Sequence, residues 1–195
     1  MFDKILEFEN ALGEFTGAPY VISTDCCTHA IELCLIYDQI KKCSFTAYTY
    51  LSIPMTMVKL DIDYSLLDEQ WSGEYQFYNT RIWDSARRLE RNMYKKNSLQ
   101  CLSFGHTKPL DNGRGGAILL DDKAAYEEIK KMRYDGRDLN IIPWIDQQNF
   151  KLGFHYKMNP EECIRALDKL KNYKEQSPVY VEYPDCRKIK IDKNR

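Results

Sequence analysis

The residues best placed to do chemistry lie around one lysine. Lys108 follows the strand-like run 99–104 and a short turn of Gly105, His106 and Thr107. Small and hydroxyl residues directly after a strand can hold an amine rigidly and shield it from water, which is the setting that an imine-forming lysine needs. The alternative interpretation is a solvated surface charge, because most lysines are exposed.

A second candidate site precedes a helix. The short apolar strand 20–23 is followed by Asp-Cys-Cys-Thr at 25–28 and then by a helical pattern from Ala30 to Tyr37. A helix that begins in a tight turn presents unpaired backbone N–H groups and a positive dipole end, and these bind phosphate. A capped helix without a ligand is the alternative.

Two stretches around Lys108 resemble a known family. Residues 102–108 read Leu-Ser-Phe-Gly-His-Thr-Lys, and residues 113–116 read Gly-Arg-Gly-Gly. They resemble the lysine motif F-S-F-H-x-x-K and the following G-E-G-G of the DegT/StrS-type sugar aminotransferases, which are fold-type I pyridoxal-phosphate (PLP) enzymes. Gly105 stands where histidine is usual in that motif, and Arg114 stands where glutamate is usual.

Further segments match the same family in the same order, which a chance motif would not do. Six further motifs of the family have counterparts in this chain. They are F-E…E-x-T-G-A at residues 8–18, S-G-T-A-A at 26–30, T-[YFW] at 49–50, V-D-I-D at 60–63, I-E-D-A-A-Q at 82–87 and G-[YF]-N-Y-R-M at 152–159.

The resemblance implies which residues hold the cofactor. Thr28, next to Cys27, matches the threonine whose hydroxyl and amide bind the phosphate, and Tyr50 matches the aromatic residue that stacks on the pyridine ring. Asp84 matches the aspartate that keeps the ring nitrogen protonated, so that the ring acts as an electron sink. Arg87 takes the place of a glutamine near the ring hydroxyl.

Three more residues complete the implied site. Lys108 forms the Schiff base with the cofactor, and Ser103 of the same motif contributes to the cofactor site. His155 stands where the family has an asparagine that reaches the phosphate of a neighbouring subunit, and it can still donate a hydrogen bond to an anion. The resemblance therefore implies a homodimer with a shared active site.

Composition excludes several classes of partner. The formal net charge of -1, from 28 basic and 29 acidic residues, predicts neither a nucleic-acid nor a membrane partner. No apolar run approaches the roughly 20 residues that a membrane span needs, and the amphipathic start has no secretory pattern, so we expect a cytoplasmic protein. Seven cysteines and three histidines without ligand spacing predict reduced thiols and no metal site.

Hydrophobic periodicity predicts an α/β protein. Helical patterns occupy 3–15, 30–37, 122–134 and 160–174, and strand patterns occupy 20–23, 44–46, 48–50, 57–63, 80–83, 99–104 and 117–120. The resemblance implies a fold-type I large domain whose sheet is mixed, mostly parallel and flanked by helices. We expect a contracted version of it, because only 18 residues separate Asp63 from Ile82.

The same comparison suggests how the chain is divided. We expect residues 1–175 to form the shortened PLP-binding domain, and residues 176–195 to be a remnant of the family's C-terminal small domain or a tail. The basic stretch 186–195 is expected to be loosely ordered.

The resemblance implies a two-stage transamination. An amino donor, typically glutamate, would give its amino group to the cofactor, and a nucleotide-linked keto-sugar would receive it while Lys108 moves the proton. Two alternatives stay open: a degenerate PLP-binding protein without transaminase activity, and a phosphate-binding α/β module that does not use PLP.

Overall fold

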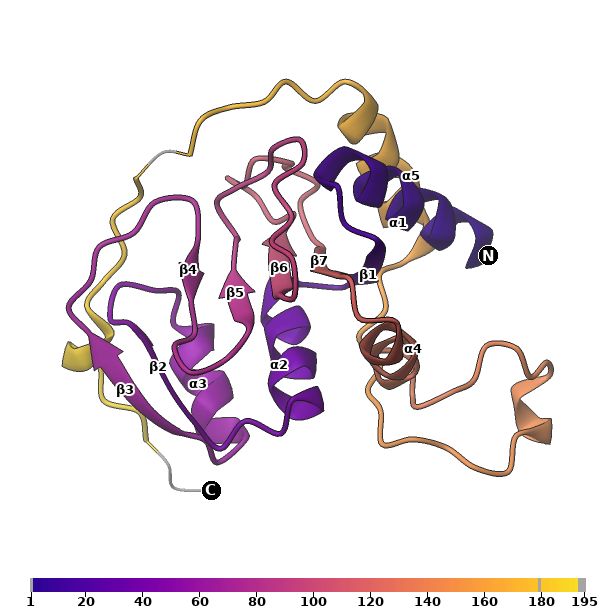
Figure 1. Ribbon diagram of the computed structural model, residues 1–195, viewed down its shortest axis with the longest axis horizontal. Helices are drawn as coiled ribbons and strands as arrows, with labels where there is room; N and C mark the ends of the chain where they lie inside the picture. Colours follow the sequence, from indigo (N-terminus) through magenta and orange to yellow (C-terminus); the bar gives the residue numbers. More distant parts are fainter. Residues whose placement is uncertain (1, 179, 193–195) are drawn as a thin grey trace.

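The computed structural model describes residues 2–178 and 180–192, which form helices around a central sheet (Figure 1). The helices are α1 (Phe2–Thr16), α2 (Cys27–Tyr37), α3 (Ser52–Lys59), α4 (Lys123–Met132) and α5 (Pro160–Lys171), with 3-10 turns η1 (Trp144–Asp146) and η2 (Cys186–Lys188). The strands are β1 (Tyr20–Thr24), β2 (Lys42–Thr46), β3 (Asp63–Leu67), β4 (Tyr75–Gln76), β5 (Ile82–Asp84), β6 (Leu99–Ser103) and β7 (Gly116–Leu120). Within the described ranges, every helix is too short or too polar to cross a membrane.

The main sheet has the strand order β1-β7-β6-β5-β4, and the parallel pair β2-β3 lies beside β4. The two parts are linked where the Tyr78 N–H donates to the Ser44 carbonyl at 2.7 Å. The expected mixed sheet flanked by helices is confirmed, but it is not mostly parallel. In the main sheet only β5 and β6 run parallel, whereas the ladders β1-β7, β6-β7 and β4-β5 are antiparallel. The short link 77–81 permits only an antiparallel β4, since a parallel neighbour needs a longer crossover.

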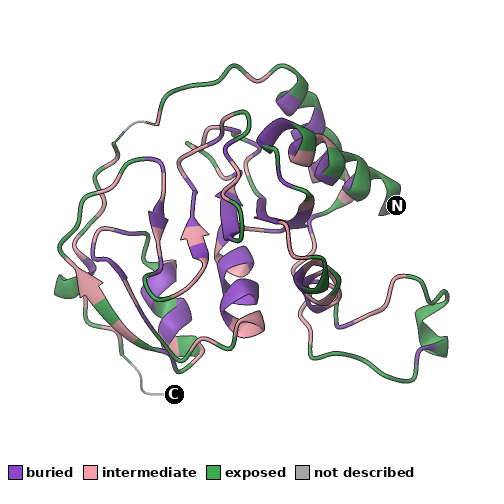
Figure 2. Ribbon diagram, viewed as in Figure 1, coloured by how far each residue is buried: buried purple, intermediate pink, exposed green. Residues whose placement is uncertain are grey.

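Alternate residues of the central strands face two separate hydrophobic cores. On β7, Ile118 and Leu120 pack with residues of α2, α3 and α4, whereas Ala117 and Leu119 pack with residues of α1 and α5. Successive strand side chains point to opposite faces, so one strand serves both cores. The result is a three-layer α/β/α arrangement in which the central strands are buried (Figure 2).

Two helices begin at signals that the sequence itself carries. Asp122 caps α4 by accepting backbone hydrogen bonds at 2.9 and 3.1 Å. At the start of α5, the Glu162 carboxylate accepts the Asn159 N–H at 3.0 Å. These local interactions explain why the predicted helices at 122–134 and 160–174 are confirmed in position.

Two predicted strands are wrong. The pattern at 57–63 predicts a strand, but Met57 lies in α3, and β3 begins only at Asp63. The helix buries Ile53 and Met57, which are four residues apart on one face. Pro54 is tolerated because the first turn of a helix does not need its N–H group. The other strand predicted nearby, 48–50, is a loop with one isolated bridge at Tyr48.

The chain after α5 crosses the molecule from α5 past β4 to β3 (Figure 1). The Cys186 N–H donates to the Ala47 carbonyl at 2.9 Å, and Asp185 bridges to Tyr48. The expected loose order is therefore wrong for η2, because backbone hydrogen bonds attach it to the body. Residues 193–195 of the same prediction lie outside the described residues.

Candidate active site

One pocket of about 500 Å³ brings together the residues that the sequence predicts. Its volume lies in the range of roughly 300–1,000 Å³ that is usual for small-molecule sites. The pocket lies at the carboxyl ends of β5 and β6 and at the amino end of α2. The predicted residues that line it are Cys27, Thr28, Tyr50, Asp84, Arg87, Ser103 and Lys108.

The amino end of α2 forms one wall of the pocket. The side chain of the N-cap residue, Cys26, makes no capping hydrogen bond to the first helical turn. The Thr28 hydroxyl lies 2.7 Å from the Ser52 hydroxyl of α3, which fixes its position. An uncapped helix end that opens on a cavity suits an anion such as phosphate.

Gly116 allows β7 to approach this turn closely. A Cβ at this position would lie 2.5 Å from the Cys27 nitrogen and 2.6 Å from the Cys26 carbonyl carbon. Any other residue would therefore push the amino end of α2 away from the strand. The glycine-rich motif at 113–116 thus shapes the pocket wall through backbone contact.

A buried carboxylate lies at the inner end of the pocket. Asp84 is 5% exposed and accepts hydrogen bonds from the Ala86 N–H and the Tyr75 hydroxyl, both at 2.9 Å. Burial raises the pKa of Asp84, and these bonds together with the charge of Lys108 offset only part of that effect. A ligand N–H group that approaches Asp84 would stabilise the charged form of the carboxylate.

Lys108 lies in a turn with strained backbone. Its N–H donates to the Gly105 carbonyl at 3.2 Å, and Thr107 adopts a φ of 70°, which a β-branched residue rarely does. Arg87 braces the turn by donating to the Thr107 carbonyl at 2.6 Å. The Lys108 amine donates to the Tyr183 hydroxyl at 3.4 Å. Strain of this kind is concentrated at functional sites.

Beside the α2 end lies an ion cluster that the sequence does not predict. His29 Nδ1 and an Arg114 nitrogen contact the two carboxylate oxygens of Asp25 at 2.6 and 2.8 Å. Burial raises the pKa of Asp25, but the two partners outweigh it and hold this pKa below its ordinary value. Burial lowers the pKa of His29, but the hydrogen bonds to Asp25 and Cys26 prevail and raise it to about 9. With His29 and Arg114 both protonated and Asp25 ionised, the cluster carries one net positive charge beside the amino end of α2.

The same cluster contains ligand types that metals use. Atoms of Asp25, Cys26 and His29 lie within 4.8 Å of one another. A metal ion there would have to displace His29 and Arg114 from the carboxylate, because both already bind its oxygens. We therefore infer no metal site.

His155 does not lie in the pocket. Its side chain is 71% exposed and contacts the Asp135 carboxylate at 3.0 Å, in the region where 151–157 returns past the end of α4. The structure separates it from the predicted residues of its own chain. Its action in a neighbouring subunit stays a prediction.

Sequence reasoning misses several residues of the site. Trp71, Val181, Glu182 and Tyr183 line the pocket, and Tyr75 supports Asp84 from behind. They come from the short connection around β4 and from the C-terminal segment, where no family motif marks them. The only signal in the sequence is a local gathering of aromatic residues, which indicates burial but no role.

The fold is that of the fold-type I PLP-dependent aminotransferases. A solved structure of AtS13 from Actinomadura melliaura is similar with a TM-score of 0.74 and 16% identity, over 86% of this chain and 59% of that chain. The sugar aminotransferase CalS13 from Micromonospora echinospora gives a TM-score of 0.70 and 13% identity, over 87% and 61% of the respective chains.

The sequence profile of the DegT/DnrJ/EryC1/StrS aminotransferase family matches residues 1–68 and 86–179. The chain belongs to this family, which confirms the resemblance found in its motifs. Asp84 lies between the two matched stretches, and Tyr183 lies after them.

A sequence relative is the UDP-4-amino-4,6-dideoxy-N-acetyl-beta-L-altrosamine transaminase of Campylobacter jejuni. It is 28% identical over 100 residues, which are 48% of this chain and 26% of the relative. The chain therefore spans 26% of this relative and 59% and 61% of the two solved chains.

Proposed function

We propose that the protein is a PLP-dependent aminotransferase that transfers an amino group from an amino acid, glutamate, to a keto-sugar. One observation carries the proposal: Lys108, Asp84 and the amino end of α2 line a single pocket. Family membership supports it, and so does the sugar transaminase named among the relatives. The keto-sugar is proposed as nucleotide-linked, because the name of that relative describes a UDP-sugar.

The residues of the pocket fit PLP in charge and shape. The uncapped N–H groups of α2 suit its phosphate, and the buried carboxylate of Asp84 suits its ring nitrogen. Tyr50, which is 65% exposed at the pocket, offers an aromatic face to its ring. When bound, PLP supplies an electron sink for the electrons left by breaking the Cα–H bond of an amino acid.

Each residue then has a distinct task. Thr28 and the α2 amides bind the phosphate, with the Cys27 thiol beside them, which is neutral because burial raises its pKa. Asp84 holds a proton on the ring nitrogen, since its buried carboxylate gains from a cationic partner. Lys108 would attach the cofactor and would move the proton at the donor Cα.

Two other pocket residues are proposed to orient the cofactor. Ser103 is the last residue of β6 and lines the pocket, where its hydroxyl can donate a hydrogen bond to the cofactor. Arg87 donates to the Thr107 carbonyl in the turn that carries Lys108, and its place in the family motif implies that it would contact the ring hydroxyl. Both assignments follow the family motifs and the shared pocket.

The proposal extends to assembly and location. We expect a homodimer in which His155 reaches the phosphate site of the partner, since its side chain is exposed and outside its own pocket. We assign residues 1–175 to the cofactor domain and 176–195 to a C-terminal segment. All seven cysteines are free, which supports a reducing compartment such as the cytoplasm.

Absorption spectroscopy tests the activity. Purified protein mixed with PLP should show the visible band of lysine-linked cofactor, and the band should change when glutamate is added. Lys108→Ala should abolish the band, whereas the matched control Lys4→Ala should keep it, because Lys4 lies on α1 and pairs with Glu7.

The outcomes separate the alternatives. No band, or a band that survives Lys108→Ala, would contradict the proposal. A band that no amino donor changes would favour a degenerate PLP-binding protein. Phosphate binding that is indifferent to both Lys108 and Asp84 would favour a module that does not use PLP.

A further inference from the structure

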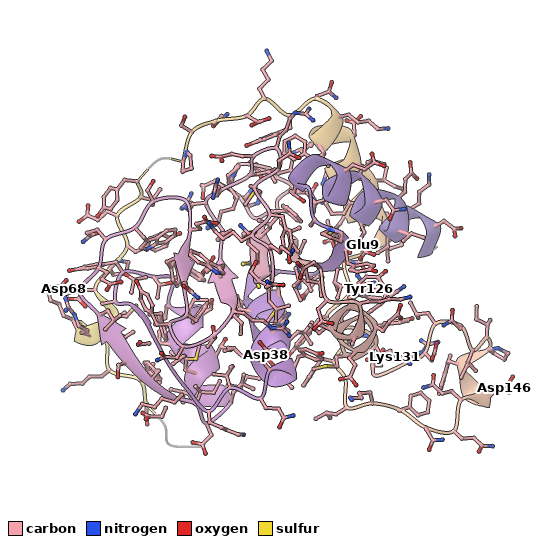
Figure 3. All side chains as sticks on the ribbon, in the orientation of Figure 1. Glu9, Asp38, Asp68, Tyr126, Lys131 and Asp146 are labelled. Atoms are coloured by element: carbon pink, nitrogen blue, oxygen red, sulfur yellow. The ribbon has the colours of Figure 1, made fainter. Side chains whose placement is uncertain are left out.

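The C-terminal segment contributes side chains to the pocket. Val181, Glu182 and Tyr183 line it, together with the motif residues. The segment is attached on both sides of this contact. The Tyr180 hydroxyl donates to the Gln70 side chain at 2.9 Å, and Arg187 contacts Asp68, labelled at the edge of Figure 3, at 3.1 Å.

The ring of Tyr183 is held between two groups. It stacks on Trp71 with 5.6 Å between ring centroids and 17° between planes, and the Arg87 guanidinium carbon lies 5.7 Å from its centroid. Trp71 is itself fixed, because its indole N–H donates to the Tyr48 carbonyl at 2.6 Å. The position of Tyr183 is therefore set by packing rather than by its hydroxyl.

The hydroxyl of Tyr183 meets the lysine that carries the chemistry. It accepts a hydrogen bond from the Lys108 amine at 3.4 Å and another from Arg87 Nε at 3.2 Å. A phenol oxygen has two acceptor sites, and these two donors fill them. Because packing fixes the Tyr183 ring, its hydroxyl holds the amine at the end of the flexible Lys108 side chain in one position.

We propose that Tyr183 is a positioning residue for the Lys108 amine, supplied by a segment outside the stretch that the family profile matches. The functional meaning of this contact rests on the proposed function, in which Lys108 binds the cofactor.

Other charged and titratable groups share the pocket with Lys108 and act on it in all variants. They are Cys26, Cys27, Asp84, Arg87, His106 and Glu182. A test must therefore remove only the Tyr183 hydroxyl. Tyr183→Phe does so and keeps the ring that stacks on Trp71. Tyr180→Phe is the matched control, since it removes a hydroxyl from the same segment outside the pocket.

Competitive acetylation of lysines in the full chain without PLP measures the effect. Mass spectrometry reads the acetylation of each lysine separately at one fixed pH. In Tyr183→Phe the Lys108 profile, which is its time course of acetylation relative to the other lysines, should become about threefold faster, because the amine loses the acceptor that holds it. Tyr180→Phe should leave the Lys108 profile unchanged.

The result does not depend on whether PLP binds, so its failure is distinct from failure of the proposed function, which the absorption band reports. Circular dichroism checks that each variant is folded. Tyr183→Leu, which also removes the ring, should move the profile in the same direction and serves if phenylalanine packs poorly. An unchanged Lys108 profile in folded Tyr183→Phe or Tyr183→Leu, or an equal change in Tyr180→Phe, would overturn the proposal.

Discussion

Two buried carboxylates in this molecule have opposite surroundings. Glu9 on α1, labelled in Figure 3, accepts the Ser23 N–H and hydroxyl, both at 2.8 Å, and pairs with Arg133. Its side chain and that of Arg133 are 4% and 3% exposed. Asp84 is equally buried, but it lies at a pocket with only a hydroxyl and one N–H as hydrogen-bond donors.

The difference teaches how to tell a structural charge from a functional one. The protein supplies Glu9 with a full countercharge, so the pair ties α1 to β1 and to the end of α4. Within the described part of the chain, Asp84 has no such countercharge in direct contact, and burial therefore raises the pKa of its carboxyl. A cationic group of a ligand can supply the missing countercharge.

The largest effect on stability is expected when the structural pair is broken. Arg133→Met leaves the Glu9 charge buried without its partner, which should lower the free energy of unfolding by about 3–5 kcal/mol. Urea unfolding measures this loss. The double variant Glu9→Leu, Arg133→Met should recover much of it because no charge stays buried. A single variant as stable as the wild type would contradict the structural role of the pair.

A smaller loss is expected at the pocket wall. In Gly116→Ala the new Cβ meets the Cys26 and Cys27 backbone, and this overpacking should cost about 1–3 kcal/mol in the free energy of unfolding. The displaced α2 end should also weaken PLP binding, measured by absorption titration. Gly105→Ala is the control, since the nearest atom to its Cβ is 3.9 Å away.

The cluster beside α2 gives a pH-dependent effect. The folded-state pKa of His29 is raised from 6.5 to about 9, so its stabilising contribution is complete below pH 6.5 and is lost as the pH rises through about 9. His29→Gln should therefore lower the melting temperature at pH 6 and have little effect above pH 9. An equal decrease at both pH values would show that packing, and not charge, explains the change.

The smallest change in stability is expected at Asp84 itself. Asp84→Asn removes a buried charge that is only partly compensated, so the free energy of unfolding at pH 7 should change by about 1 kcal/mol or less. Because the pKa of Asp84 is raised above 3.8, wild-type stability relative to this variant should fall as the pH rises from 3.8 through the raised value and then level off. The response of bound PLP to glutamate should nevertheless be lost, and a variant that keeps it would argue against the role of Asp84.

Local signals explain which parts of the fold could be predicted. The helix 3–15 and the strand 99–104 show clear periodicities, and the α4 cap at Asp122 marks its own start. The apolar residues of the run 57–63 fit either a helix or a strand. Packing of Met57 in the same hydrophobic core as α2 favours the helix. The direction of β4 also escaped prediction, because it depends on the length of the link 77–81.

The sequence by itself determined the family and the ordered motif residues from Thr28 to Lys108, because each motif is a local pattern of residue types. Only the tertiary structure decided that these residues share one pocket, that His155 is outside it, and that Trp71 and Tyr183 belong to it. The reason is physical. Contacts between segments such as 68–76 and 180–188 arise from packing and backbone hydrogen bonds across the fold, and no local pattern records which distant segment a side chain will meet.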